Sequence, residues 1–243
     1  MHQPILLLDF DGVMITQKAL EYSALKLLKN EWFNWQNTEN LRLIDLARMF
    51  EESDSSGVID SLKSIYQTYR PFIPNRIKRW IFFNRFNKMY QKYEKIYDSL
   101  RSGLPERLER LKECSIPLAI ISNTAQKRLE YFCDKFDLSK YFPVILSRED
   151  MGEHKKPHPY PILLALAKIK KRFGIKRIER GKVYFVGDLP SDIQSAHAAK
   201  IKSIAVLAGH GRKRDLLDSN PTYVIDKISD LSEIPPFQKF LIE

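Results

Sequence analysis

The chain has 243 residues, 44% of them hydrophobic and 29% charged, the composition of a soluble globular protein that can bury a sizeable core. The longest apolar stretches, residues 116–121 and 161–167, are too short to cross a bilayer, so we expect no membrane-spanning helix. The formal net charge of +10 favours acidic partners, including phosphorylated metabolites and nucleic acid.

No signal peptide is visible at the N-terminus, because residues 1–4 lack a basic region and Asp9 interrupts the apolar run that follows. The two cysteines, Cys114 and Cys133, have neither the spacing of a metal site nor the density of a disulfide framework. We therefore predict a cytoplasmic protein with reduced thiols. The sequence leaves open whether it is a monomer or a dimer.

The first element in chain order is a short apolar run, Ile5–Leu8, that ends in two aspartates and a glycine. Its length is typical of a buried strand in a parallel sheet, and ligands bind beyond the carboxyl ends of such strands. Asp9 and Asp11 would lie at that edge, with Gly12 allowing a sharp turn. Two neighbouring carboxylates repel each other and need a cation, typically Mg²⁺. The alternative is an ordinary strand and turn with chance aspartates.

Residues 16–98 have helical periodicity. We expect helices over 18–35, around 41–50, over 58–69, and from Pro74 or Asn75 to about 99, with a break at 53–57. In the first helix the apolar positions are Leu20, Ala24, Leu27, Leu28 and Trp32.

The last of these helices carries an apolar stripe and a basic stripe. A packed face opposite a solvated face explains them, and a surface that attracts phosphate or nucleic acid is the alternative. The apolar stripe comprises Ile77, Ile81, Phe86, Met89, Tyr90, Tyr93, Ile96 and Tyr97, and the basic stripe comprises Lys78, Arg85, Lys88, Lys92 and Lys95.

After residue 103, predicted strands alternate with helices, which is typical of a doubly wound parallel sheet of the Rossmann-like α/β class. We expect strands over 116–121, 144–147, 183–186, 203–207 and 222–225. We expect helices over 106–113, 125–136, 161–173 and 191–200.

Three loops follow these strands at the same sheet edge. Ser122 and Asn123 offer a hydroxyl and backbone N–H groups to a phosphate oxygen, although they could also be a plain helix N-cap. Lys156, beside Pro157, would supply a fixed positive charge, or belong to a solvated basic turn. His154 and His158 flank it without a partner at metal-ligand spacing, so we interpret them as non-ligands.

The third loop carries two more carboxylates. Asp188 ends its strand, and Asp192 lies in the first turn of the next helix, so both could meet a metal and Lys156. For Asp192, a favourable charge at a helix N-terminus is the simpler interpretation.

Taken in order, Asp-x-Asp, Ser, Lys-Pro and Gly-Asp-x-x-x-Asp resemble the four motifs of the haloacid dehalogenase (HAD) superfamily. The resemblance covers residues 1–15 and about 100–210. It implies that Asp9 is the nucleophile and Asp11 the general acid–base, and that Ser122, Asn123 and Lys156 bind the phosphoryl group.

The resemblance also implies a Mg²⁺ ion bound by Asp9, the backbone carbonyl of Asp11 and Asp188, with Asp192 in support. The long interval between Asp11 and Ser122 places an insertion where the phosphoglycolate phosphatase and β-phosphoglucomutase branches carry a helical cap. We therefore predict a catalytic core of residues 1–15 and 99–243 and a helical cap of residues 16–98.

The function implied is that of a Mg²⁺-dependent phosphatase acting on a small phosphorylated metabolite. A phosphomutase is less favoured, because residues 17–22 lack the histidine that the mutases carry there. The third hypothesis, a phosphatase of nucleotides or nucleic-acid ends or a non-catalytic binder, rests on the basic and aromatic residues of 66–101.

Overall fold

The computed structural model describes residues 3–16, 18–33 and 70–241. The chain forms two compact units, Met1–Thr16 with Leu100–Glu243, and Gln17–Ser99. The predicted helices around 41–50 and over 58–69, and the break at 53–57, lie outside the described residues. No described helix is both long and apolar enough to cross a membrane.

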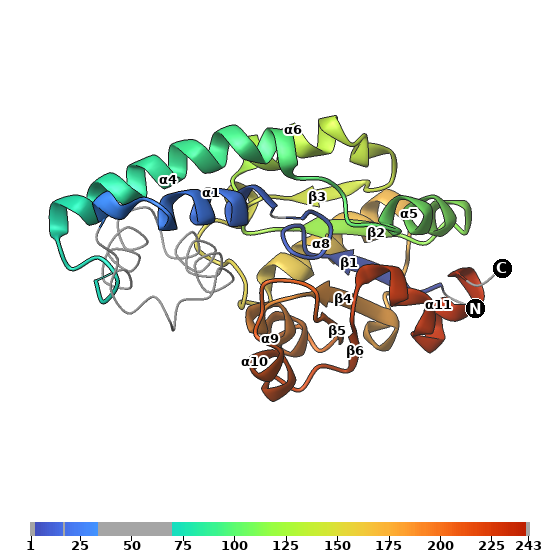
Figure 1. Cartoon of the computed structure of the whole chain (residues 1–243). Helices are drawn as coiled ribbons and strands as arrows, with labels where there is room; N and C mark the ends of the chain where they lie inside the picture. Colours follow the sequence, from blue (N-terminus) through green and yellow to red (C-terminus); the bar gives the residue numbers. More distant parts are fainter. Residues whose placement is uncertain (1–2, 17, 34–69, 242–243) are drawn as a thin grey trace. The chain divides into compact units, whose positions relative to one another are not determined.

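The first unit is built on a six-stranded, fully parallel sheet with the strand order β3-β2-β1-β4-β5-β6 (Figure 1). Its strands are β1 (Ile5–Leu8), β2 (Leu118–Ile121), β3 (Val144–Leu146), β4 (Val183–Gly187), β5 (Lys202–Val206) and β6 (Tyr223–Ile225). Because all strands are parallel, their carboxyl ends meet at one edge. The order reverses at β1, which lies in the middle of the sheet between β2 and β4.

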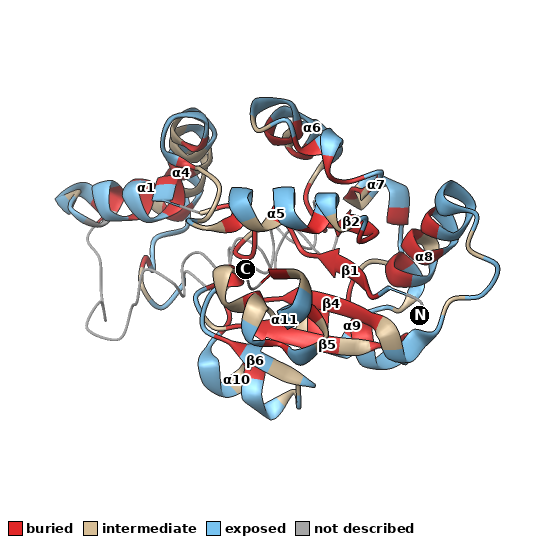
Figure 2. Cartoon of the chain, turned by 90° about the vertical axis from the view of Figure 1, so that its right-hand side faces the viewer, coloured by how far each residue is buried: buried red, intermediate tan, exposed pale blue. Residues whose placement is uncertain are grey.

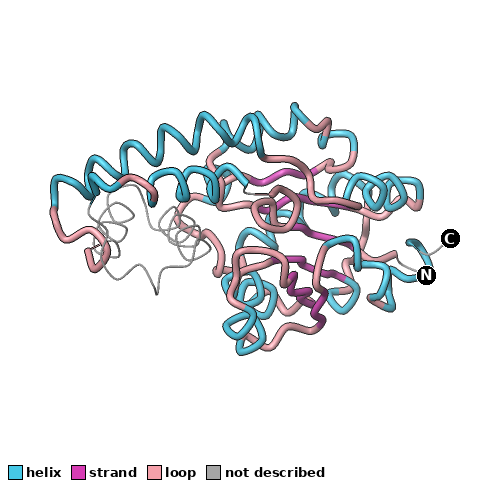
Figure 3. The backbone as a smooth tube through the Cα atoms, in the orientation of Figure 1, coloured by secondary structure: helices cyan, strands magenta, loops and turns pink. Residues whose placement is uncertain are grey.

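Helices join consecutive strands and lie on both sides of the sheet (Figure 3). They are α5 (Leu104–Glu113), α6 (Gln126–Lys135), α7 (Arg148–Met151), α8 (Tyr160–Phe173), α9 (Pro190–Ala198), α10 (Lys213–Asp218) and α11 (Pro235–Leu241). Short 3-10 turns lie at Leu138–Lys140, Arg180–Lys182 and Ile228–Glu233.

Strand β1 shows why this sheet needs helices on both faces. All four of its residues are buried, and successive side chains point to opposite sides. Leu6 and Leu8 join a core cluster with residues of α5, α6 and α11, whereas Ile5 and Leu7 join one with residues of α8 and α9. Figure 2 shows the central strands as buried, with the helices exposed on their outer sides.

These observations confirm the predicted α/β class. Every predicted strand and helix of residues 103–225 is present, and each end lies within two residues of its predicted position. The structure adds α7, α10, α11 and the turn at Ile228–Glu233, which the sequence analysis did not predict.

In the second unit the described elements are α1 (Lys18–Leu28), a 3-10 turn at Glu31–Phe33, and α4 (Arg76–Tyr97). The prediction of one helix over 18–35 was wrong, because α1 ends at Leu28. Asn30 accounts for the break, since its side-chain Oδ1 accepts a hydrogen bond from the N–H of Trp32 at 3.1 Å, a local turn that competes with helix. Trp32 is consequently 47% exposed and not part of a packed face.

Helix α4 begins where predicted, with the Asn75 side chain accepting from the N–H of Lys78 at 3.0 Å. The apolar stripe predicted on it is confirmed only in part, for Ile81, Phe86, Met89 and Tyr90, which pack in a core cluster. Ile77 is 69% exposed, whereas Phe86 is buried with Phe82 against α1 residues. A helix turns by about 100° per residue, so Ile77 and Phe86 lie on opposite sides. Arg85, Lys88, Lys92 and Lys95 are exposed, as a solvated face requires.

Candidate active site

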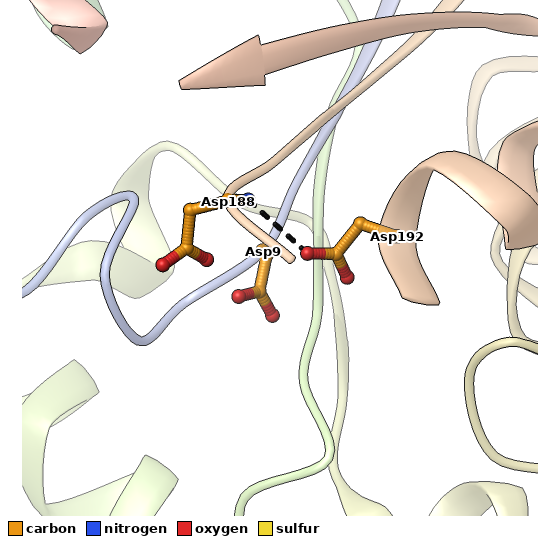
Figure 4. A group of neighbouring side chains, drawn as sticks. All are labelled: Asp9, Asp188 and Asp192. Carbon is orange, nitrogen blue, oxygen red and sulfur yellow. Dashed lines mark hydrogen bonds between the residues drawn. The ribbon is translucent and has the colours of Figure 1, made fainter. Parts of the chain in front are cut away.

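Three buried carboxylates meet at the carboxyl edge of the sheet (Figure 4). Asp9 directly follows β1, Asp188 follows the adjacent β4, and Asp192 lies in the first turn of α9. One oxygen of each lies within 4.8 Å of one oxygen of the others. The side chains are brought together because β1 and β4 pair in register, with Leu8 opposite Val186.

Lys156 provides the positive charge of this cluster. It lies between α7 and α8, and its Nζ is 2.5 Å from Oδ1 of Asp9 and 2.7 Å from Oδ1 of Asp192. The other oxygen of Asp192 accepts hydrogen bonds from the backbone N–H groups of Asp188 and Leu189, at 3.1 and 3.0 Å. Both oxygens of Asp192 are therefore held by the protein itself.

The Asp188 side chain is fixed by residues that surround it closely. Its Oδ2 accepts the backbone N–H of His210 at 2.6 Å, and Nδ1 of the same histidine lies 3.2 Å away. A Cβ atom at Gly12 or Gly209 would overlap the Asp188 carboxylate, and one at Gly211 would overlap its carbonyl oxygen. The backbone of Gly12, Gly209 and Gly211 thus forms a close wall around Asp188.

The electrostatics of the cluster show that it lacks positive charge. Burial raises the pKa of Asp9 well above its ordinary value, against the effect of Lys156, and the carboxylates of Asp192 and Asp188 raise it further. Burial opposes the charged form of Lys156, but Asp192 and Asp9 outweigh it and hold its pKa above the usual value. Asp9 and Asp192 thus share one lysine, and the third carboxylate, Asp188, lies beside them.

A divalent cation with oxygen ligands fits these residues. Oδ1 of Asp188 is buried and finds no hydrogen-bond donor among the residues that the structure describes. A buried carboxylate oxygen without a donor is costly unless a cation binds it. Mg²⁺ prefers oxygen ligands, and Asp9 and Asp188 present carboxylate oxygens here.

The Asp11 carboxylate is bound by side chains that do not belong to this cluster. Its Oδ1 and Oδ2 both lie 2.8 Å from Nη1 of Arg128, and the Thr124 hydroxyl also donates to Oδ2. Burial opposes ionisation of Asp11, but Arg128 and Thr124 outweigh it and lower the pKa of its carboxyl. Asp11 is therefore a carboxylate at neutral pH.

Ser122 and Asn123 follow β2, beside β1 in the sheet. The N-cap alternative is wrong for Ser122, because α6 begins after Ala125. The Ser122 hydroxyl is buried and accepts the N–H of Thr124 at 3.1 Å. Oδ1 of Asn123 is also buried, and no described residue donates a hydrogen bond to it. This oxygen is therefore still available as an acceptor.

Three side chains of the site were not predicted: Thr124, Arg128 and His210. For His210 the sequence held a signal, since Gly209-His210-Gly211 follows the predicted strand 203–207 at the same sheet edge. Thr124 adjoins the predicted Ser122-Asn123 loop. Nothing in the sequence distinguishes Arg128 from the other basic residues of its helix.

Comparisons with known proteins identify the family of the chain. The family model described as haloacid dehalogenase-like hydrolase matches residues 6–206. A relative from Caldanaerobacter subterraneus subsp. tengcongensis, named putative pyrophosphatase PpaX, is 32% identical over 64% of this chain and 68% of its own length. The phosphoglycolate phosphatase of Photorhabdus laumondii subsp. laumondii is 30% identical over 60% of this chain, and the match spans 59% of that protein.

Among solved structures, a predicted phosphoglycolate phosphatase from Haemophilus somnus 129PT has a similar fold. It aligns with a TM-score of 0.70 over 96% of this chain and 98% of its own, at 21% identity. At that identity the likeness concerns the fold alone.

Proposed function

Because the chain belongs to the haloacid dehalogenase-like hydrolase family, we propose that it is a Mg²⁺-dependent phosphatase that hydrolyses a small phosphomonoester through an aspartyl-phosphate. Family membership confirms the resemblance carried by the four motifs and the prediction of an enzyme of the hydrolase class. The phosphatase names of the relatives support the reaction proposed. A cytoplasmic location and a monomeric or dimeric state stay predictions.

The observation that carries the proposal is the contact between Asp9 and Lys156. A nucleophilic carboxylate must be buried and close to a cation that favours its ionised form and offsets the charge of the incoming phosphoryl group. The Asp9 side chain is 7% exposed, and Nζ of Lys156 lies 2.5 Å from its Oδ1. Lys156 would orient Asp9 and then bind the phosphoryl oxygens, together with Ser122 and Asn123 at the next strand end.

In the first step a carboxylate oxygen of Asp9 forms a bond to phosphorus while the bond to the leaving oxygen breaks. Asp11, two residues along the chain, would act on that leaving oxygen as the general acid; because its carboxyl is ionised at neutral pH, it must first take up a proton from solvent, which it then gives to the leaving oxygen. In the second step water attacks phosphorus, Asp11 accepts its proton, and the bond between phosphorus and Asp9 breaks to give inorganic phosphate. Arg128 and Thr124 favour the ionised Asp11 that this second step needs.

We propose that Asp9, Asp188 and the backbone carbonyl of Asp11 would hold Mg²⁺. When bound, the ion supplies positive charge that offsets the negative charge of the phosphoryl oxygens. Asp192 would act in support, because its oxygens already bind Lys156 and two backbone N–H groups. The second compact unit would serve as a cap that excludes water, which remains a prediction.

The test is the release of inorganic phosphate from a panel of phosphomonoesters, with Mg²⁺ and with a chelator. The panel comprises p-nitrophenyl phosphate, phosphoglycolate, sugar phosphates, nucleotides and pyrophosphate. We expect Mg²⁺-dependent release that Asp9→Asn abolishes and Asp137→Asn, an exposed site where asparagine suits the left-handed backbone, leaves intact. Release by Asp9→Asn at the wild-type rate would contradict the nucleophile. Isomerisation of a sugar phosphate without phosphate release would indicate a mutase.

A further inference from the structure

The guanidinium of Arg128 is an unassigned cation at the acid–base side of the site. It belongs to the first turn of α6, and Nη1 lies 2.8 Å from both oxygens of Asp11 and 3.4 Å from Oγ1 of Thr124. Its Cζ lies 5.1 Å from the ring centroid of Phe132, which is fully buried. These contacts fix the position of the guanidinium.

Arg128 and Lys156 occupy different environments. The Lys156 side chain is 4% exposed and pairs with Asp9 and Asp192, the carboxylates around the proposed nucleophile. The Arg128 side chain is 18% exposed and pairs with Asp11, whose own side chain is 14% exposed. Lys156 is thus enclosed with the nucleophile, whereas Arg128 and Asp11 face the side from which solvent or a substrate can reach them.

The proposed role of Asp11 places the leaving group next to Arg128. A general acid must come within hydrogen-bond distance of the leaving oxygen, and Nη1 of Arg128 already lies at that distance from Asp11. A chemical group attached one or two bonds beyond the leaving oxygen would therefore be close to the guanidinium. A guanidinium binds carboxylate or phosphate oxygens in a planar, bidentate arrangement.

We infer that Arg128 determines substrate specificity by binding an anionic group on the leaving part of the substrate. The preferred substrates are then phosphomonoesters of short alcohols that carry a carboxylate or a second phosphate close to the ester oxygen. The inference rests on the proposed function, since it takes Asp11 to act on the leaving oxygen. If Arg128 only oriented Asp11, it would affect charged and neutral substrates equally.

Two matched pairs of substrates separate these roles. In the first pair, phosphoglycolate carries a carboxylate where carbamoylmethyl phosphate carries a neutral amide. In the second pair, ethane-1,2-diol bisphosphate carries a second phosphate where 2-hydroxyethyl phosphate carries a hydroxyl. We expect wild-type kcat/KM to favour the anionic member of at least one pair tenfold or more. Which pair shows the preference identifies the anion as carboxylate or phosphate.

Arg128→Gln keeps hydrogen-bond donors near Asp11 but removes the charge. Because Arg128 also holds Asp11 ionised, both members of a pair should lose activity, but we expect kcat/KM for the preferred anionic substrate to fall at least tenfold more than kcat/KM for its neutral partner, with the extra loss mostly in KM. Arg128→Lys should retain part of the preference. Lys127→Gln is the matched control, because it removes one exposed positive charge from the same helix, and it should leave the ratio unchanged.

Equal rates for both members of each pair in the wild type, or an equal loss of both in Arg128→Gln, would overturn the inference. The wild-type ratio decides this even if Arg128→Gln fails to fold. A different result is that the wild type releases phosphate from p-nitrophenyl phosphate in an Asp9-dependent reaction and yet shows no preference for the anionic members. That result would overturn the inference and leave the proposed function standing. Absence of release from every substrate would instead contradict the proposed function.

Discussion

Nζ of Lys156 lies between two buried carboxylates, 2.5 Å from Oδ1 of Asp9 and 2.7 Å from Oδ1 of Asp192. Removal of this lysine would leave buried carboxylates without their cation, which is among the costliest single changes in a protein. We expect Lys156→Met to lower the free energy of unfolding by about 3–5 kcal/mol at pH 7 without metal, as measured by urea denaturation.

The matched control for this variant is Lys182→Met. Lys182 lies 2.8 Å from a carboxylate oxygen of Glu179, but both side chains are more than 40% exposed, so its loss should cost less than about 1 kcal/mol. The double variant Lys156→Met with Asp192→Asn should recover part of the loss. Equal costs for the two lysines would contradict the charge balance described for the site.

Magnesium binding is the second prediction. A ligand that binds the native state at one hundred times its dissociation constant stabilises it by about 2.7 kcal/mol, so Mg²⁺ should raise the melting temperature of the wild-type protein. Asp188→Asn should abolish that rise, because it removes charge at the carboxylate whose Oδ1 has no protein donor among the described residues. Asp137→Asn should retain the full rise in the same thermal scan. An unchanged rise in Asp188→Asn would exclude Asp188 as a ligand.

Gly12 and Gly174 allow a test of the wall around Asp188. Both have a left-handed backbone, with φ of 78° and 63°, so alanine should cost about 1–2 kcal/mol in backbone strain at either position. At Gly12 the added Cβ would also overlap the Asp188 carboxylate and lie 2.6 Å from Nδ1 of His210, whereas at Gly174 it meets nothing within 4 Å. We expect Gly12→Ala to lose Mg²⁺ binding and phosphatase activity, and Gly174→Ala to keep both. Similar activity in the two variants would show that the wall can shift.

Much of the core and the main site could be predicted from sequence because both depend on local patterns. Short apolar runs between turn residues identify the buried strands, and acids, hydroxyls and a lysine at strand ends share one edge of a parallel sheet. Asp9, Lys156, Asp188 and Asp192 are consequently brought together as the pattern indicates.

The remaining features depend mostly on tertiary contacts, and in one case on a local hydrogen bond that the helical periodicity does not reveal. Arg128 is one of several charged residues in α6, and only the packing of that helix directs it to Asp11. The end of α1 depends on one side-chain hydrogen bond of Asn30, and the buried face of α4 depends on the neighbours it packs against. Helix α11 is a short segment held by the burial of Phe237 and Leu241.

The Cys133 thiol supplies a prediction about pH. Burial raises its pKa from 9.0 to about 12, with smaller contributions from Asp134 and Glu130. The folded pKa exceeds the unfolded one, so the neutral thiol's stabilisation is fully present below about pH 9 and is lost as pH rises toward 12, by up to about 1.4 kcal/mol per pH unit.

Urea denaturation of the wild type and of Cys133→Ala between pH 7 and pH 11 measures this effect. The alanine variant lacks the titrating thiol, so we expect the difference in unfolding free energy between the two proteins to shrink above pH 9. A difference that stays constant over that range would show that the thiol ionises equally well in the folded and unfolded chain.

The central position of β1 governs the order in which the core can assemble. Leu6 pairs with Leu118 on one side and with Tyr184 on the other, both more than one hundred residues further along the chain. During synthesis β1 can pair with β2 first, but its other edge stays unpaired until β4 has been made, and such unpaired edges are prone to associate with other chains. A chain that stopped before residue 183 would leave β1 as an exposed edge. Asp9 is therefore made early but meets Lys156, Asp188 and Asp192 only when the later parts of the core have emerged.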